Sequence, residues 1–192
     1  MKKKNLFGAV VFTIALIAGT SGFAQSKMSK DDTKMVGGAA MYPSKNIVEN
    51  AVNSKDHTTL VAAVTAADLV STLQSEGPFT VFAPVNKAFE ALPAGTVETL
   101  LKPENKAALQ GVLTYHVLAG KFSAADVVAA IKKGNGTATF TTVAGGKLMA
   151  KIVNGNVQLV DENGGTATVT IADVNQSNGV IHVIDAIVLP KS

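Results

Sequence analysis

The stretch GPFTVFAPVNKAF, residues 77–89, joins a strand pattern to a helix pattern in one short segment. It opens with a glycine–proline turn and continues through residues 79–83, a run rich in aromatic and β-branched side chains that favour a strand. Pro84 ends this strand, because proline lacks the backbone N–H that a sheet requires. Asn86 is then predicted to cap a brief helix that Pro93 stops.

The sequence around this segment, from residue 46 to about 133, has mostly helical periodicity. Asp56 is predicted to cap a helix with an apolar stripe, and a second helix should run from Pro103 to about Tyr115. Ser123 is predicted to cap a third helix, which Gly134 follows at its end.

After Gly136 the hydrophobic period changes to two, which is typical of strands. Asn154 and Gly155 tolerate positive φ angles, so they predict a type I′ hairpin between two of these strands. The last strand, from about 180 to 189, is almost continuously apolar, and we expect both of its faces to be buried. Helices followed by strands in a chain of this length indicate an α+β domain.

The N-terminus has the pattern of a secretory signal peptide over residues 1–24. Three lysines precede an apolar run of about 13 residues, and small residues stand before a predicted cut at Gln25. This run is shorter than the roughly 20 residues that a membrane-spanning helix needs, so no span should remain after cleavage. We expect an exported protein, periplasmic or secreted, with a flexible or loosely docked arm over residues 25–43 and one domain over residues 44–192.

Charge and composition exclude several classes of function. The chain has 17 basic and 14 acidic residues, and loss of the three lysines of the signal peptide leaves 14 of each. A neutral protein whose basic residues are all lysines is a poor ligand for nucleic acid or for an anionic membrane surface. The absence of cysteine excludes disulfides and thiolate chemistry.

No catalytic or metal-binding pattern is found in the sequence. The three histidines, His57, His116 and His182, have no HExxH or i, i+4 spacing, so we interpret them as separate structural or surface residues. There is no G-x-S-x-G segment and no phosphate-binding glycine loop. We therefore predict a protein that is not an enzyme, with no metal site and no cofactor.

Three stretches, 77–89, 113–121 and 178–190, together resemble the signature blocks of fasciclin-type (FAS1) domains. Their order and spacing both match, and the resemblance spans residues 46–190. The chain departs from the family at Leu118 and Ala119, where a proline is more common before the glycine. This likeness points to a bacterial, secreted, single-domain member of the family.

The resemblance implies a wedge-shaped β-sandwich packed against a layer of several helices. It also implies an extracellular, non-enzymatic protein used in adhesion. Tyr115 and His116 match the family's tyrosine–histidine motif and are, by resemblance, the candidate partner-binding residues. The alternative is structural, because a histidine at a helix end readily satisfies local hydrogen bonds.

Two functional hypotheses stay open at this point. The first is a monomeric adhesion module that contacts a protein or polysaccharide partner at the cell surface. The second is a carrier of an apolar small molecule, such as a lipid or a carotenoid, held between helices and sheet. The second hypothesis rests on a hydrophobic content of 47% with only 5% aromatic residues, which leaves room for a space lined by aliphatic side chains.

Overall fold

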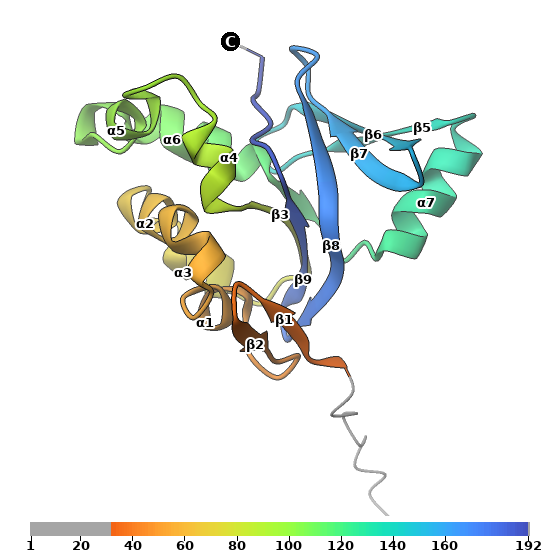
Figure 1. The fold of residues 1–192 in the computed structure, drawn as a ribbon, viewed down its shortest axis with the longest axis horizontal. Helices are drawn as coiled ribbons and strands as arrows, with labels where there is room; N and C mark the ends of the chain where they lie inside the picture. The colour runs from red at the N-terminus through yellow and green to blue at the C-terminus, as the bar shows by residue number, and fades with distance from the viewer. Residues whose placement is uncertain (1–31, 192) are drawn as a thin grey trace, which may run out of the picture.

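The structure, a computed structural model, describes residues 32–191 (Figure 1). The predicted signal peptide and residues 25–31 of the predicted arm lie outside the described residues. The strands are β1 (Lys34–Val36), β2 (Ala39–Met41), β3 (Phe79–Pro84), β4 (Val117–Ala119), β5 (Thr137–Thr141), β6 (Lys147–Val153), β7 (Asn156–Val160), β8 (Thr166–Gln176) and β9 (Gly179–Ile184). The α-helices are α1 (Ile47–Ala51), α2 (Thr58–Ala66), α3 (Val70–Gln74), α4 (Asn86–Glu90), α5 (Thr96–Leu100), α6 (Lys106–Tyr115) and α7 (Ala124–Lys133). Among residues 32–191, no helix has the length and apolar character needed to cross a membrane.

Seven strands form one sheet in the order β4-β3-β9-β8-β7-β6-β5. Strands β3 and β9 run parallel, and the other neighbouring pairs are antiparallel. The sheet curves until its edges approach each other, and an antiparallel bridge joins Leu118 of β4 to Thr142, next to β5. Helices α1 to α6 gather on one side of this sheet, whereas α7 packs on β5 and β6 (Figure 1). The predicted α+β class is confirmed, and the two halves of the curved sheet supply the faces of the sandwich.

Two hydrophobic cores lie on opposite faces of β3 and β9, because successive side chains of a strand point to opposite sides. On β3, Val81 and Ala83 belong to the core beneath the helices, whereas Phe82 belongs to the core inside the curved sheet. On β9, Ile181 and Ile184 are divided in the same way. Every residue of β9 is buried, as predicted, but the strand ends at Ile184 and not near residue 189, and Asp185 and Leu189 beyond it are exposed.

The N-terminal hairpin refines one expectation, since residues 34–41 were predicted to belong to a flexible or loosely docked arm. Strands β1 and β2 pair antiparallel, and Val36 and Met41 are each only 1% exposed, within the core beneath the helices. Gly37 and Gly38, with φ angles of +58° and +76°, make the turn of the hairpin. The ordered domain therefore begins before residue 44.

Asn86 caps a different helix from the one predicted. Helix α4 begins at Asn86 itself, and the side-chain amide binds the N-terminus of α2 instead. Its Oδ1 atom accepts from the backbone N–H of Thr59 at 3.1 Å and from the hydroxyl of Thr58 at 3.2 Å. Its Nδ2 atom donates to the carbonyl of Lys55 at 2.8 Å. The prediction that Asp56 caps α2 is wrong, because a side chain distant in sequence supplies the cap.

The Asn86→Ala variant should lose about 1–2 kcal/mol of unfolding free energy, because the first turn of α2 loses its acceptor. Urea unfolding followed by circular dichroism measures this loss. The matched control is Lys87→Ala, at the exposed neighbouring position, which should change the free energy by less than about 0.5 kcal/mol. Equal stability of the two variants would contradict the capping role of Asn86.

Two local predictions are confirmed. The hydroxyl of Ser123 accepts from the backbone N–H of Asp126 at 3.2 Å, and the carboxylate of Asp126 accepts from the backbone N–H of Ser123 at 2.9 Å. This reciprocal pair is the capping box of α7. Asn154 and Gly155 have φ angles of +52° and +81° in the hairpin between β6 and β7.

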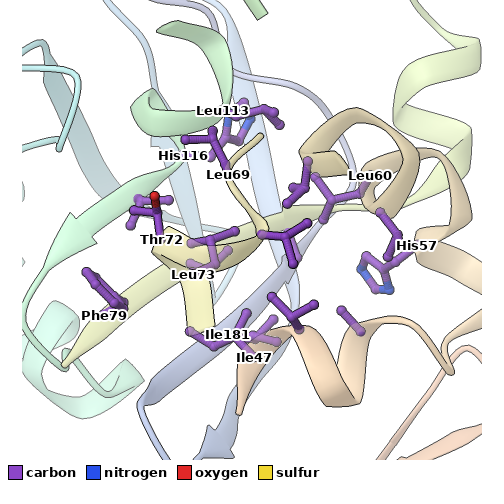
Figure 2. Close-up of a pocket in the computed structure, with 18 of the residues that line it drawn as sticks. Ile47, His57, Leu60, Leu69, Thr72, Leu73, Phe79, Leu113, His116 and Ile181 are labelled. Carbon is purple, nitrogen blue, oxygen red and sulfur yellow. The ribbon is translucent and has the colours of Figure 1, made fainter. Parts of the chain in front are cut away.

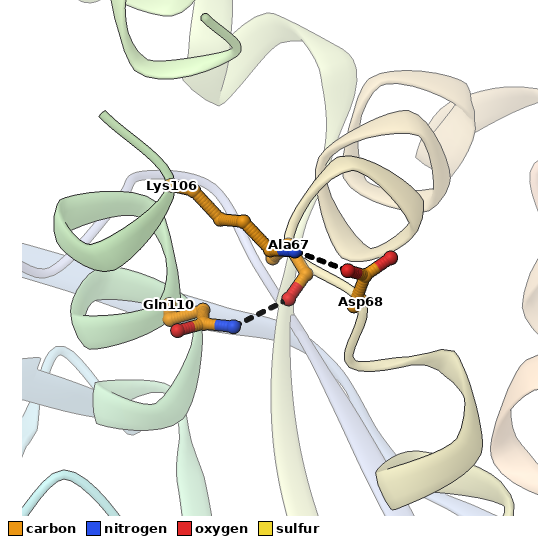
Figure 3. A network of polar contacts seen from close by, with 4 residues as sticks. All are labelled: Ala67, Asp68, Lys106 and Gln110. Carbon is orange, nitrogen blue, oxygen red and sulfur yellow. Dashed lines mark hydrogen bonds and ion pairs between the residues drawn. The ribbon is translucent and has the colours of Figure 1, made fainter. Parts of the chain in front are cut away.

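The corner between α2 and α3 is tied to α6 by two polar contacts (Figure 3). The side-chain amide of Gln110 donates to the carbonyl of Ala67 at 2.7 Å, and Lys106 forms an ion pair with Asp68. The ion pair is solvent-exposed and therefore contributes little free energy. The hydrogen bond of Gln110, together with the fully buried Ala67, fixes the position of this corner. These contacts tie α6 to the corner between α2 and α3, and all three helices contribute lining residues to the cavity described below.

Candidate functional site

Tyr115, one of the two candidate partner-binding residues, is fully buried in the core inside the curved sheet. Its hydroxyl donates to the carbonyl of Lys147 at 2.6 Å and accepts from the backbone N–H of Glu162 at 3.3 Å. The side chain thus joins the end of α6 to β6 and to the loop after β7. This role is structural, because both of its polar contacts are made with the backbone of the same domain.

His116, the second candidate, is 3% exposed and links α6 to the C-terminal block. Its Nδ1 atom donates to the carbonyl of Val112 at 2.8 Å, and its Nε2 atom accepts from the backbone N–H of Val188 at 3.3 Å. Burial lowers the pKa of His116 from 6.5 to about 4, although the carbonyl of Val112 and the charge of Asp161 oppose this change. The imidazole is therefore neutral at pH 7.

Tyr115 and His116 are buried, so neither side chain is exposed to a macromolecular partner in this structure. The structural alternative accounts for both residues, since all of their polar atoms are satisfied within the domain. Tyr115 and His116 are adjacent at the end of α6. The side chain of Tyr115 binds the sheet, and the side chain of His116 binds the C-terminal block at Val188.

Asp161, which is 3% exposed, has a comparable structural role that the sequence did not predict. Its carboxylate accepts from the backbone N–H groups of Asn163 at 2.9 Å, Gly165 at 2.7 Å and Leu189 at 2.9 Å. An aspartate followed by asparagine and glycines is the only sequence signal, and it indicates a turn. In residues 32–191, no group of three or more His, Cys, Asp or Glu side chains is arranged to hold a metal ion.

A cavity of about 180 Å³ lies beneath the helices (Figure 2). Helices α1, α2 and α3 line it with Ile47, Leu60 and Leu73, and β9 contributes Ile181. The end of α6 closes a further side with Leu113. The lining is mostly aliphatic and also includes Phe79 and Phe82, so the cavity can hold apolar matter through the hydrophobic effect but offers no cluster of reactive groups. We call this space the α1–α3 pocket.

The α1–α3 pocket reaches the molecular surface. Two valines that line it are largely exposed to solvent: Val52 is 54% exposed and Val143 is 48% exposed. Asn178 binds two of the helices that line the pocket, α1 and α3. Its Oδ1 atom accepts from the backbone N–H of Ile47 at 3.1 Å, and its Nδ2 atom donates to the carbonyl of Leu73 at 2.8 Å. Helices α1 and α3 are thus anchored to the start of β9, while an apolar entrance to the pocket stays open.

His57 also lines the α1–α3 pocket, and it was interpreted from sequence only as a separate structural or surface residue. It is 1% exposed, and its Nδ1 atom lies 2.9 Å from the hydroxyl of Ser54. Burial lowers the pKa of His57, against the smaller opposing influences of the Ala83 backbone and the charge of Asp56. His116 lines the same pocket, so two buried histidines lie among its mostly apolar side chains (Figure 2).

The chain is similar to a family of known proteins. The sequence model described as the fasciclin domain matches residues 55–190. A protein of Synechocystis sp., sll1483, is 47% identical, and the match covers 94% of this chain and 95% of that protein. The immunogenic protein MPB70 of Mycobacterium bovis is 31% identical, and the match covers the full length of both.

Two further similarities extend to animal proteins. The transforming growth factor-beta-induced protein ig-h3 of Sus scrofa is 35% identical over 69% of this chain, which corresponds to 17% of that protein. Among solved structures, a FAS1 domain pair from the insect cell adhesion molecule fasciclin I superposes with a TM-score of 0.66 at 18% identity. That match covers 76% of this chain and 51% of the insect chain, and it shows a shared fold.

Proposed function

This chain belongs to the fasciclin (FAS1) domain family, and from that premise we propose that it is an exported, non-enzymatic binding module whose binding site is the α1–α3 pocket. The ligand is an apolar small molecule. The observation that carries this proposal is the cavity of about 180 Å³ with an aliphatic lining and an open entrance. An engineered apolar cavity of about 150 Å³ stays dry and binds benzene, so a space of this size is sufficient for a ring or a short chain.

The size of the α1–α3 pocket also limits the ligand. Pockets that enclose drug-sized molecules measure about 300–1,000 Å³, so this one holds only part of a larger lipid or carotenoid. The rest of such a molecule extends through the entrance beside Val52 or Val143. A carrier role for a long apolar molecule therefore requires either partial enclosure or opening of the helices.

A second candidate function is adhesion to a protein or polysaccharide at the cell surface, by a monomer. It is supported by the fold shared with an insect adhesion molecule and by exposed apolar side chains near the N-terminal hairpin. Met35 is 61% exposed, Tyr42 is 45% exposed, and the ammonium group of Lys45 lies 5.4 Å from the centre of the Tyr42 ring. Loss of partner capture in a Tyr42→Ala variant that still binds apolar ligand would favour this candidate.

Binding to the α1–α3 pocket can be tested by filling it. Leu73→Trp adds a large side chain at the centre of the lining, and benzene should then bind at least about tenfold more weakly, as read from NMR shifts of the isoleucine, leucine and valine methyl groups. The matched control is Leu92→Trp, in a separate cavity of about 50 Å³ beside α5 and α6, which should leave binding unchanged. Equal binding by both folded variants would reject the α1–α3 pocket as the site.

A further inference from the structure

A second apolar cavity adjoins the α1–α3 pocket within the same hydrophobic core. It has a volume of about 50 Å³ and lies beside α5 and α6, and we call it the α5–α6 cavity. Ala63 of α2, Leu100 of α5 and Leu109 of α6 line it. Of the described residues, Leu113 and His116, at the end of α6, line both this cavity and the α1–α3 pocket (Figure 2). The two spaces therefore meet at these two residues.

The two shared side chains differ in how firmly they are held. Both ring nitrogens of His116 are hydrogen-bonded, to the backbone of Val112 and of Val188, so the imidazole cannot turn without leaving these groups unpaired. Leu113 has no polar side-chain atom, and the empty space on either side of it removes packing contacts that would oppose a change of rotamer. Leu113 is thus the movable part of the boundary between the two spaces.

The size of the α5–α6 cavity limits what can enter it. An apolar cavity that binds benzene measures about 150 Å³, so a ring does not fit into a space of about 50 Å³. On the same scale of about 25 Å³ for each carbon atom, the α1–α3 pocket holds about seven carbon atoms and the α5–α6 cavity about two more. Only the thin end of an unbranched chain suits the smaller space.

We propose that the α1–α3 pocket takes an unbranched alkyl chain whose end passes Leu113 and fills the α5–α6 cavity. This inference rests on the proposed function, because it concerns the ligand of the same pocket. The head of the ligand remains at the entrance beside Val52 and Val143, where water can reach it. The chain beyond the head is surrounded by mostly apolar side chains, so each buried methylene group adds to the affinity.

Straight-chain primary alcohols provide a graded set of probes, because successive members differ by one methylene group. Burial of one methylene increases affinity about fourfold. In a methyl NMR titration, the affinity should rise by about this factor for each added carbon atom from hexanol to nonanol and then level off. The methyl signals of Leu100 and Leu109, which line the α5–α6 cavity and not the α1–α3 pocket, should shift with nonanol and not with hexanol.

The Ala63→Val variant fills the α5–α6 cavity from α2 with two additional carbon atoms. It should bind hexanol as the unaltered protein does, and nonanol at least about tenfold more weakly. The matched control is Ala62→Val, which makes the same change at the neighbouring, exposed position of α2 and should leave both affinities unchanged. If Ala63→Val does not fold, the signals of Leu100 and Leu109 in the unaltered protein decide the question.

The outcomes separate this inference from the proposed function. Affinities that stop rising at about seven carbon atoms, with methyl shifts in the α1–α3 pocket alone, would overturn the passage of the chain beyond Leu113 and leave the pocket as a binding site. Shifts in the α5–α6 cavity with hexanol as well would also overturn it, because they would show separate entry to that cavity. The absence of shifts in the α1–α3 pocket with every alcohol would overturn the proposed function itself.

Discussion

The Gly179→Ala protein should fail to fold or lose more than about 4 kcal/mol of its free energy of unfolding. Gly179 is buried and pairs with Phe79 where β3 and β9 run parallel. An added Cβ atom would overlap with the carbonyl oxygen of Phe79, which is backbone and cannot move aside as a flexible side chain can. Strands β3 and β9 lie between the two hydrophobic cores, so a larger distance between these strands disrupts the packing of both cores. Urea unfolding measured by circular dichroism tests this result.

Gly111→Ala is the matched control, because it makes the same chemical change inside α6. No heavy atom lies within 4 Å of the added Cβ there, and alanine favours a helix over glycine by about 0.5–1 kcal/mol. This variant should be as stable as the unaltered protein or slightly more so. If Gly179→Ala were equally harmless, the close contact between β3 and β9 would be wrong.

The second large effect is a loss of stability in mild acid. His116 is neutral in the folded state because its pKa is lowered to about 4, whereas the unfolded chain has the ordinary value of 6.5. Protonation would place a second N–H on Nε2 against the backbone N–H of Val188, which already donates to that atom. Burial also lowers the pKa values of His57 and His182, so all three histidines act in the same direction.

The sign of the effect follows from proton binding. Between pH 6.5 and about 4, the unfolded chain binds a proton at His116 that the folded protein does not, so stability falls as the pH falls. A pKa difference of one corresponds to about 1.4 kcal/mol. His116 alone should therefore lower the free energy of unfolding by about 3 kcal/mol between pH 6.5 and about 4. Above pH 6.5 its contribution should be fully present and constant.

The His116→Gln variant separates this effect from the titration of carboxylates. Glutamine can donate to Val112 and accept from Val188 but has no proton to gain, so the slope of stability against pH between 6.5 and 4 should decrease. Urea unfolding at several pH values gives both slopes. A histidine NMR titration that found His116 with a pKa near 6.5 in the folded protein would contradict the account directly.

Local patterns in the sequence predicted much of this fold. The alternation of apolar residues after Gly136, the Asn154–Gly155 turn and the Ser123 cap each depend on neighbours within a few positions, and each is confirmed. The order of helical and then strand periodicity predicted the α+β class, and the family blocks implied a sandwich packed against helices. By contrast, the pairing of β3 with β9 joins residues about a hundred positions apart, and periodicity alone carries no information about such partners.

The candidate site was predicted much less well, for the same reason. Tyr115 and His116 were nominated by resemblance, yet the partners that explain their burial come from β6, the loop after β7 and the C-terminal block. Asn86 has the residue type of a cap, but the helix it caps lies earlier in the chain. The position of His57 beside the pocket likewise depends on elements that are far apart in the sequence.

The central claim is that the helices and β9 enclose a space that accepts apolar matter, and xenon tests it most directly. Xenon occupies dry apolar cavities of this size, so crystals of the protein exposed to the gas should show a xenon atom among Ile47, Leu73 and Ile181. A crystal in which these side chains close on one another, with xenon bound elsewhere or not at all, would contradict the claim.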